Sequence, residues 1–210
     1  MDTLGVTEPQ QAPQTQAKLW SPSLVVFVSN ACIMVLELVA GRIIAPYVGA
    51  SLYTWTSVIG VILAGMSLGN YLGGRFADRW ASPRFLGSTF VVASLLSLGV
   101  IVLDRLGILV HVGGPLILEI VVVIAVLFFL PATVLGTISP VVAKLALRDL
   151  DSTGRTVGRI YAAGSAGSIV GTFATGFLLI AWLDTHAIVL VVSLVLLLLG
   201  LIFLLMRRQS

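Results

Sequence analysis

The stretch THAIVLVVSLVLLLLGLIFLLM, residues 185–206, decides the fold class because it contains no Asp, Glu, Lys or Arg over its whole length. About 20 apolar residues in an α-helix cross the hydrocarbon core of a bilayer. The stretch lacks the alternation of apolar and polar residues that marks the strands of a membrane β-barrel, so a helix is favoured. Five further stretches of similar character precede it, at residues 24–48, 53–77, 84–103, 115–143 and 156–182. The sequence therefore predicts an all-α integral membrane protein with six transmembrane helices.

The composition excludes an ordinary soluble domain. Hydrophobic residues make up 58% of the chain and charged residues only 10%, whereas soluble domains carry about 25% charged residues. The mean hydropathy is +1.10. The single cysteine, Cys32, lies inside the first predicted span, so the sequence allows no intrachain disulfide, and we expect a small buried residue there.

The positions of the basic residues predict the orientation in the membrane, because cytoplasmic loops carry an excess of Lys and Arg. A cytoplasmic N-terminus places most of the basic residues on the cytoplasmic side: Lys18, Arg75, Arg79, Arg84, Lys144, Arg148, Arg155, Arg159, Arg207 and Arg208. Arg105 falls in an outer loop and Arg42 inside the first span. We therefore expect both termini in the cytoplasm, in the plasma membrane of a bacterium or an archaeon.

The chain divides into a short tail and a membrane domain. Residues 1–20 are rich in Gln, Pro and Thr and have no apolar periodicity, which predicts a disordered cytoplasmic tail. The tail lacks the basic region and short apolar core of a cleaved signal peptide. Residues 21–208 are predicted to form the six-helix transmembrane domain.

Several residues mark where helices should begin. Pro22, Pro83 and Pro115 are expected in the first turn of three helices, where the missing N–H of proline costs nothing. Asp184 is expected to cap the last helix.

The fourth span is longer than a straight crossing needs and contains Pro131 and Pro140. It should therefore kink, or break within residues 131–140. Interrupted helices mark substrate sites in transporters, although most membrane prolines only bend a helix. Both interpretations stay open at this stage.

Small residues recur at helical spacing in two spans, where they let the backbones of neighbouring helices approach closely. They are Gly65, Gly69 and Gly73 in the second span, and Ala163, Gly167, Gly171 and Thr175 in the fifth. The two interpretations are tight packing within the bundle and a homodimer seam or sliding surface.

Three ionisable residues inside the predicted spans need an explanation, since a charge in hydrocarbon is costly unless it is paired or hydrated. Glu37 and Arg42 are five residues apart, so they lie roughly 140° apart around the helix and do not pair with each other. Arg42 and Glu119 lie at similar depths from the outer ends of their spans. We expect an ion pair between them, or else a side chain of Arg42 that reaches the outer headgroups.

Glu37 lies near mid-membrane without a basic partner in the sequence. It is expected to bind a proton or a cation, or to stay neutral and hydrogen-bond a neighbouring polar group. Candidate neighbours in the first two spans are Ser29, Asn30, Ser67 and Asn70. Glu37, Arg42 and Glu119 together form the predicted intramembrane polar centre.

Aromatic residues gather near the predicted span ends, where amphipathic rings favour the headgroup level. They are Trp20, Tyr47, Tyr53, Trp55, Trp80 and Trp182. Tyr53 and Trp55 have the alternative of shaping the mouth of an outer cavity.

The sequence contains no pattern for catalysis. It has no Gly-rich nucleotide loop, no metal-ligand cluster and no Ser/His/Asp set, and His111 and His186 are predicted in outer loops without clustered partners. We therefore predict no catalytic residue, metal or cofactor for this chain.

The segment ELVAGRIIAPYVGASLYTWTSVIGVILAGMSLGNYLGGRFADR, residues 37–79, resembles the membrane half of the fused transporter-like spermidine synthase family. The stretches at residues 131–147 and 154–177 are similar to the fourth and fifth spans of that family. The resemblance implies a bundle like one half of a major facilitator transporter, whose halves each contain three-plus-three inverted repeats.

Gly74, Asp78, Arg79 and Arg84 are similar to the loop between the second and third spans of major facilitator transporters. There Gly74 would permit close packing, and Asp78 would accept from Arg75, from Arg79 or from a helix N-terminus. The alternative is an ordinary basic cytoplasmic loop.

In that family a soluble aminopropyltransferase-like domain follows the membrane part. The resemblance implies that this chain anchors or feeds a separate cytoplasmic spermidine-synthase-like partner. The alternatives are a homodimeric small-molecule or polyamine transporter, in which Glu37 binds substrate or protons, and a structural subunit of a membrane complex. No nucleic-acid partner is expected, since the basic residues form no dense patch.

Overall fold

The computed structural model describes residues 21–106, 115–147 and 153–205. In these ranges, six helical spans are long and apolar enough to cross a membrane. The all-helical fold class is confirmed, and no strand occurs in these ranges. The expected tail, residues 1–20, lies outside them. The spans are α1 (Pro22–Val48), α2 (Leu52–Trp80), α3 (Pro83–Arg105), Leu116–Ala146, Thr153–Trp182 and α9 (Thr185–Leu205).

The helix starts follow the local sequence. Pro22 and Pro83 stand at the first positions of α1 and α3. Asp184 caps α9, because its carboxylate accepts from two backbone N–H groups of the first turn, at 3.2 and 3.3 Å. Pro115 differs from the expectation, since it precedes the helix in an extended conformation with φ −60° and ψ 133°.

The fourth span is divided into four pieces. They are α4 (Leu116–Ile124), the π-helical turn η1 (Ala125–Phe129), α5 (Leu130–Gly136) and α6 (Ile138–Ala146). Pro131 is the second residue after the wider π turn, and the break between α5 and α6 falls between the two prolines, within the segment expected from the sequence. The fifth span consists of α7 (Thr153–Phe173), η3 (Ala174–Leu179) and α8 (Ile180–Trp182).

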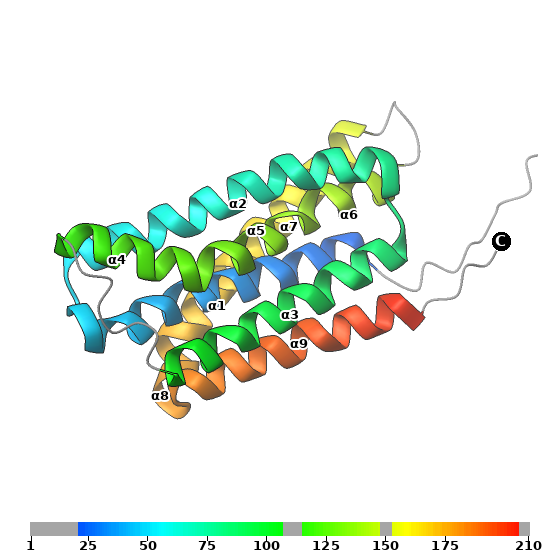
Figure 1. The fold of residues 1–210 in the computed structure, drawn as a ribbon. Helices are drawn as coiled ribbons and strands as arrows, with labels where there is room; N and C mark the ends of the chain where they lie inside the picture. The colour runs from blue at the N-terminus through cyan, green and yellow to red at the C-terminus, as the bar shows by residue number, and fades with distance from the viewer. Residues whose placement is uncertain (1–20, 107–114, 148–152, 206–210) are drawn as a thin grey trace, which may run out of the picture.

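The spans pack in three principal pairs, as Figure 1 shows. Helix α1 lies along α7, α2 lies along the pieces of the fourth span, and α3 lies along α9. In chain order these pairs are first with fifth, second with fourth, and third with sixth. If the first span is exchanged with the fourth, the second with the fifth and the third with the sixth, the same three pairs result.

The two ends of the bundle differ in charge. One end holds the start of α1, the end of α9 and the α2–α3 connection (Figure 1). We name it the basic end after its described basic residues, which are Arg75, Arg79, Arg84, Lys144, Arg155 and Arg159. The opposite end carries Asp104, Asp184, Arg42 and Arg105.

Candidate functional site

Glycines bring two helix pairs into backbone contact. A Cβ atom on Gly167 of α7 would overlap the carbonyl oxygen of Phe27 in α1, and one on Gly171 would overlap Ala31. The small residues of the fifth span therefore pack inside the bundle, which is the first of the two interpretations from the sequence. Ala163 is half-buried, and Thr175 is buried and donates to the carbonyl of Gly171 at 2.7 Å.

The glycines of α2 do the same against the fourth span. A Cβ on Gly69 would overlap the carbonyl oxygen of Thr133, and one on Gly65 would lie 2.9 Å from the carbonyl oxygen of Phe129. Gly73 faces α6 in the same way, with Thr137 and Pro140 at the contact. These contacts hold α2 against α5 and α6 as closely as α7 is held against α1.

A pocket of about 360 Å³ lies between these two helix pairs. It is walled by α1, α2, α5, α6 and α7, and its polar lining residues are Asn30, Asn70, Ser139, Tyr161, Ser165 and Ser168. Asn30 donates from Nδ2 to the carbonyl oxygen of Val26 at 2.9 Å and to Oγ of Ser139 at 3.5 Å. None of the described lining residues carries a charge at neutral pH, so the pocket presents amide and hydroxyl groups to its contents.

The pocket lies within the membrane-length part of the bundle. Asn30 comes eight residues after the start of α1 and Asn70 ten residues before the end of α2, which corresponds to depths of about 12 and 15 Å from the basic end. Gly136 and Pro140, on either side of the break in the fourth span, also line the pocket. The interrupted helix therefore contributes directly to this site.

Glu37 lies on the same face of α1 as Asn30, seven residues further along, which is two turns or about 10 Å toward the opposite end. It is half-buried. One turn beyond it, a Cβ on Gly41 would lie 3.0 Å from the ring of Trp55, so this ring packs across α1 at that level. Glu37 thus stands between the pocket and an aromatic cover.

Arg42 and Glu119 do not form the expected ion pair. The ion pairs among the described residues join Asp78 to Lys144 and His186 to Asp104 and Asp184. Arg42 is exposed six residues before the end of α1, so the alternative interpretation, a side chain that reaches the outer headgroups, stays a prediction. Glu119 is half-buried in the first turn of α4, which packs more extensively on α2 than on α1.

Two residues of the predicted loop motif, Gly74 and Asp78, make contacts that differ from those expected. No other helix of the described chain packs closely on Gly74, because no atom lies within 4 Å of a Cβ built on it. Asp78 accepts from Nζ of Lys144 at 3.0 Å, which joins α2 to α6, instead of pairing with a neighbouring arginine. Arg79 and Arg84 are exposed at the end of α2 and the start of α3.

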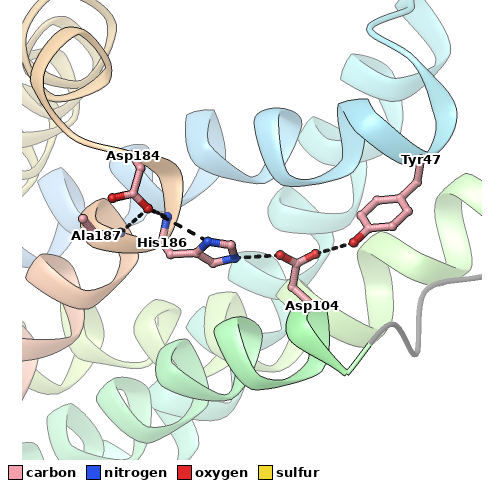
Figure 2. Close-up of polar contacts among 5 residues, drawn as sticks. All are labelled: Tyr47, Asp104, Asp184, His186 and Ala187. Atoms are coloured by element: carbon pink, nitrogen blue, oxygen red, sulfur yellow. Dashed lines mark hydrogen bonds and ion pairs between the residues drawn. The ribbon is translucent and has the colours of Figure 1, made fainter.

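A polar network that the sequence did not predict lies at the opposite end of the bundle (Figure 2). Tyr47 donates to Oδ1 of Asp104 at 3.0 Å, and Nε2 of His186 lies 2.7 Å from Oδ2 of the same carboxylate. Nδ1 of His186 lies 4.0 Å from Asp184. The expectation that His186 has no clustered partner is therefore wrong, whereas His111 lies outside the described residues.

This network ties together the end of α1, the end of α3 and the start of α9 (Figure 2). The Asp104 side chain is only 11% exposed. The only sequence signal for it is that Asp104 and His186 flank span ends on the same side of the membrane. That signal places them at one level without showing that they are neighbours.

The remaining predicted residues are aromatic residues near helix ends and one buried cysteine. The aromatic residues Tyr47, Tyr53, Trp55, Trp80 and Trp182 are exposed near helix ends, as a belt requires, and Trp20 lies outside the described residues. Cys32 is buried. Within the described ranges no group of His, Cys, Asp and Glu is arranged to hold a metal ion.

Comparison with known protein families, curated proteins and solved structures found no match to this chain.

Proposed function

We propose that this chain is a transporter-type membrane module that binds a small, uncharged polar molecule in the pocket between α1, α2, α5, α6 and α7. The observation that carries the proposal is the pocket itself. Its volume of about 360 Å³ falls in the range of small-molecule sites, roughly 300–1,000 Å³. Polar groups at this depth in a membrane bundle are costly, and those that face a cavity commonly serve a ligand pathway.

Two features of the architecture support a transporter-type module. The break between α5 and α6 lines the pocket, which is where interrupted helices of transporters place their substrate sites. The pairing of the spans also has the symmetry expected of a three-plus-three repeat. Both features support the resemblance to half of a major facilitator transporter.

The chemistry of the lining favours an uncharged ligand over a polyamine. A polyamine carries several ammonium groups, which need carboxylates or other acceptors of high charge density when they leave water. The pocket offers amides and hydroxyls, and the nearest carboxylate on the same face of α1 is Glu37, about two turns away. Glu37 is better placed to carry a coupling proton along the same path.

A second candidate is that the module delivers its ligand to a cytoplasmic spermidine-synthase-like partner. It rests on the resemblance and on the position of the pocket nearer the basic end, which we propose faces the cytoplasm. Co-purification of a soluble partner in mild detergent, lost when the chain is cut after Met206, tests this candidate. A partner retained by the shortened chain would contradict recruitment through this end.

The pocket is tested by filling it. Ser168→Trp places a large ring in the pocket, whereas Val170→Trp on the same helix points outward and serves as the control. Purified protein is heated with a panel of uncharged polar metabolites and with spermidine, and compounds that raise the unfolding temperature are then tested for uptake into proteoliposomes. We expect stabilisation of the wild type and Val170→Trp but not of Ser168→Trp.

Equal stabilisation of both tryptophan variants would place the ligand elsewhere, and spermidine as the only stabilising compound would contradict the proposed ligand class. Glu37→Gln separates binding from coupling. We expect it to retain binding and to lose uptake driven by a proton gradient. No ligand and no partner in these experiments would favour the structural-subunit interpretation.

A further inference from the structure

Four of the arginines at the basic end form two pairs with the same spacing. Arg75 and Arg79 lie in the last turns of α2, and Arg155 and Arg159 lie in the first turns of α7. The members of each pair are four residues apart, so their side chains project from the same face of their helix. All four are exposed, and none forms an ion pair with another residue that the structure describes. These charges therefore have no carboxylate partner in the described ranges.

The two pairs differ in what surrounds them. A groove of about 400 Å³ lies beside the α2 pair. Its described lining residues all come from α2: Leu72, Arg75, Phe76, Asp78, Arg79 and Trp80. The rings of Phe76 and Trp80 stack with their centroids 5.7 Å apart, and Phe85 of α3 meets Phe76 edge-on at 6.2 Å. In the α7 pair each arginine follows a glycine, Gly154 or Gly158, and no atom lies within 4 Å of a Cβ built on either.

Arg75 is oriented by an aromatic ring and not by an acid. Its Nη1 donates to the phenolic oxygen of Tyr71 at 3.1 Å, and its guanidinium carbon lies 5.7 Å from the centroid of the same ring. A guanidinium group has five N–H donors, and this hydrogen bond uses one of them. The other donors are available for the paired hydrogen bonds that a phosphate accepts.

The groove has a positive net charge. Among its described lining residues, Asp78 is the one carboxylate. Its charge is offset by Lys144 of α6, whose Nζ lies 3.0 Å from Oδ1 of Asp78. The charges of Arg75 and Arg79 therefore remain, and they attract an anion to this part of α2.

The groove runs from the end of α2 into its membrane-spanning part. Trp80 is the last residue of the helix and is 57% exposed, as suits a ring at the headgroup level. Leu72 lies eight residues earlier, which is about 12 Å deeper along the helix. When α2 crosses a bilayer, one end of the groove meets headgroups and the other meets hydrocarbon. An occupant that fits both ends is anionic at one end and apolar at the other.

We propose that this groove binds an anionic phospholipid from the leaflet at the basic end. Arg75 and Arg79 bind the phosphate of the headgroup, and an acyl chain lies along Leu72 and Phe76. Inorganic phosphate would leave the apolar end of the groove without a partner. An acidic segment of a soluble protein would have to enter hydrocarbon to reach Leu72. A zwitterionic lipid would bring its own cation toward the two arginines, so the positive groove favours an anionic headgroup.

This lipid site is separate from the pocket of the proposed function. The two have no lining residue in common, and the groove lies closer to the end of α2. Lipid binding at Arg75 and Arg79 therefore neither needs nor implies a ligand in the pocket.

The two arginine pairs provide a matched test of the lipid site. The double variants Arg75→Gln/Arg79→Gln and Arg155→Gln/Arg159→Gln each remove two exposed positive charges from the same end of the bundle. The full chain and both variants are purified in a neutral detergent, checked by gel filtration, and titrated with dioleoyl phosphatidylglycerol. Native mass spectrometry then measures the affinity for the first bound lipid. Dioleoyl phosphatidylcholine, which has the same acyl chains, is titrated in parallel.

We expect the α2 variant to bind phosphatidylglycerol at least about tenfold more weakly than the wild type, because two charge-assisted contacts to the phosphate are lost. The α7 variant should bind it as the wild type does. Equal losses in both variants would show that the arginines attract lipid only by their charge, and they would overturn the proposal. Equal affinities of the wild type for the two lipids would also overturn it.

Two further measurements examine the two ends of the groove. Arg75→Lys/Arg79→Lys keeps both charges but loses the paired donors, so we expect an affinity between those of the wild type and the glutamine variant. Inorganic phosphate is added as a competitor to test the apolar end. We expect it to leave the bound phosphatidylglycerol in place. Displacement of the lipid by inorganic phosphate at equal concentration would show that the site recognises the anion alone, which contradicts a lipid site.

Discussion

The two ends of the bundle use similar polar side chains in opposite ways. At the opposite end, Tyr47, Asp104 and His186 bind one another and hold α1, α3 and α9 together (Figure 2). Toward the basic end, Asn70 and Ser165 face the pocket and the open surface. Polar groups that satisfy one another stabilise a closed contact, whereas polar groups that line a cavity are available to a ligand.

The two ends of the bundle also differ in the access that they give to the pocket. Trp55 packs against Gly41 on the face of α1 that leads from Glu37 to the opposite end. The pocket, in contrast, lies within about 15 Å of the basic end and has exposed rim residues. We therefore interpret the pocket as covered toward the opposite end and accessible at its exposed rim residues on α2 and α7, Asn70, Tyr161 and Ser165.

The largest effect is expected from breaking a wall of the pocket. Gly69→Leu places a side chain where the carbonyl of Thr133 lies, so α2 must separate from α5. We expect destabilisation by about 3 kcal/mol or more and little folded protein. Gly99→Leu fills open space and should leave the yield unchanged. Fluorescence-detected gel filtration of both variants measures this, and equal yields would show that the wall tolerates separation.

The next effect is expected from breaking the network at the opposite end. Asp104→Ala removes the acceptor of Tyr47 and of His186, and since hydrogen bonds to a charged group contribute about 1.5–3 kcal/mol, we expect a loss of roughly 2 kcal/mol. Tyr47→Phe removes one bond and should cost less. Thermal unfolding in detergent compares the two variants, and an unchanged unfolding temperature for Asp104→Ala would mean that the network contributes nothing to closure.

A smaller effect is expected from removing the aromatic cover. In a Cys32→Ala background, Glu37→Cys is labelled with a membrane-impermeant maleimide added at the opposite end. We expect Trp55→Ala to accelerate labelling several-fold, because the ring that packs on Gly41 is gone. Tyr53→Ala, which removes a neighbouring exposed ring, is the control. If both variants label at the wild-type rate, Trp55 does not limit access.

The smallest effect is expected at the basic end from Lys144→Ala. The Asp78–Lys144 ion pair is well exposed, with 49% of the lysine side chain and 72% of the aspartate side chain accessible. Pairs of this kind contribute between zero and about 1 kcal/mol, and salt screens them. A double-mutant cycle with Asp78→Ala in low and high salt measures the coupling. A coupling well above this range that persists in high salt would assign the pair a part in holding α6.

The sequence by itself determined the six spans and their ends. The length of an apolar run and its flanking capping residues are local properties, so Pro22, Pro83 and Asp184 mark helix starts without reference to the rest of the fold. The break within residues 131–140 followed from two prolines for the same reason. The stripes of glycine were also visible, although not what they pack against.

Only the tertiary structure decided which polar groups meet. Sequence position fixes how deep a residue lies along a helix. Depth alone pairs Arg42 with Glu119, which form no ion pair with each other in the structure, and it does not reveal the contact of Asp104 with His186. Whether two residues at one depth touch depends on which helices are neighbours and on the rotation of each helix about its axis. Those are set by the glycine-mediated packing of α1 on α7 and of α2 on α5, which brings together residues far apart in the chain.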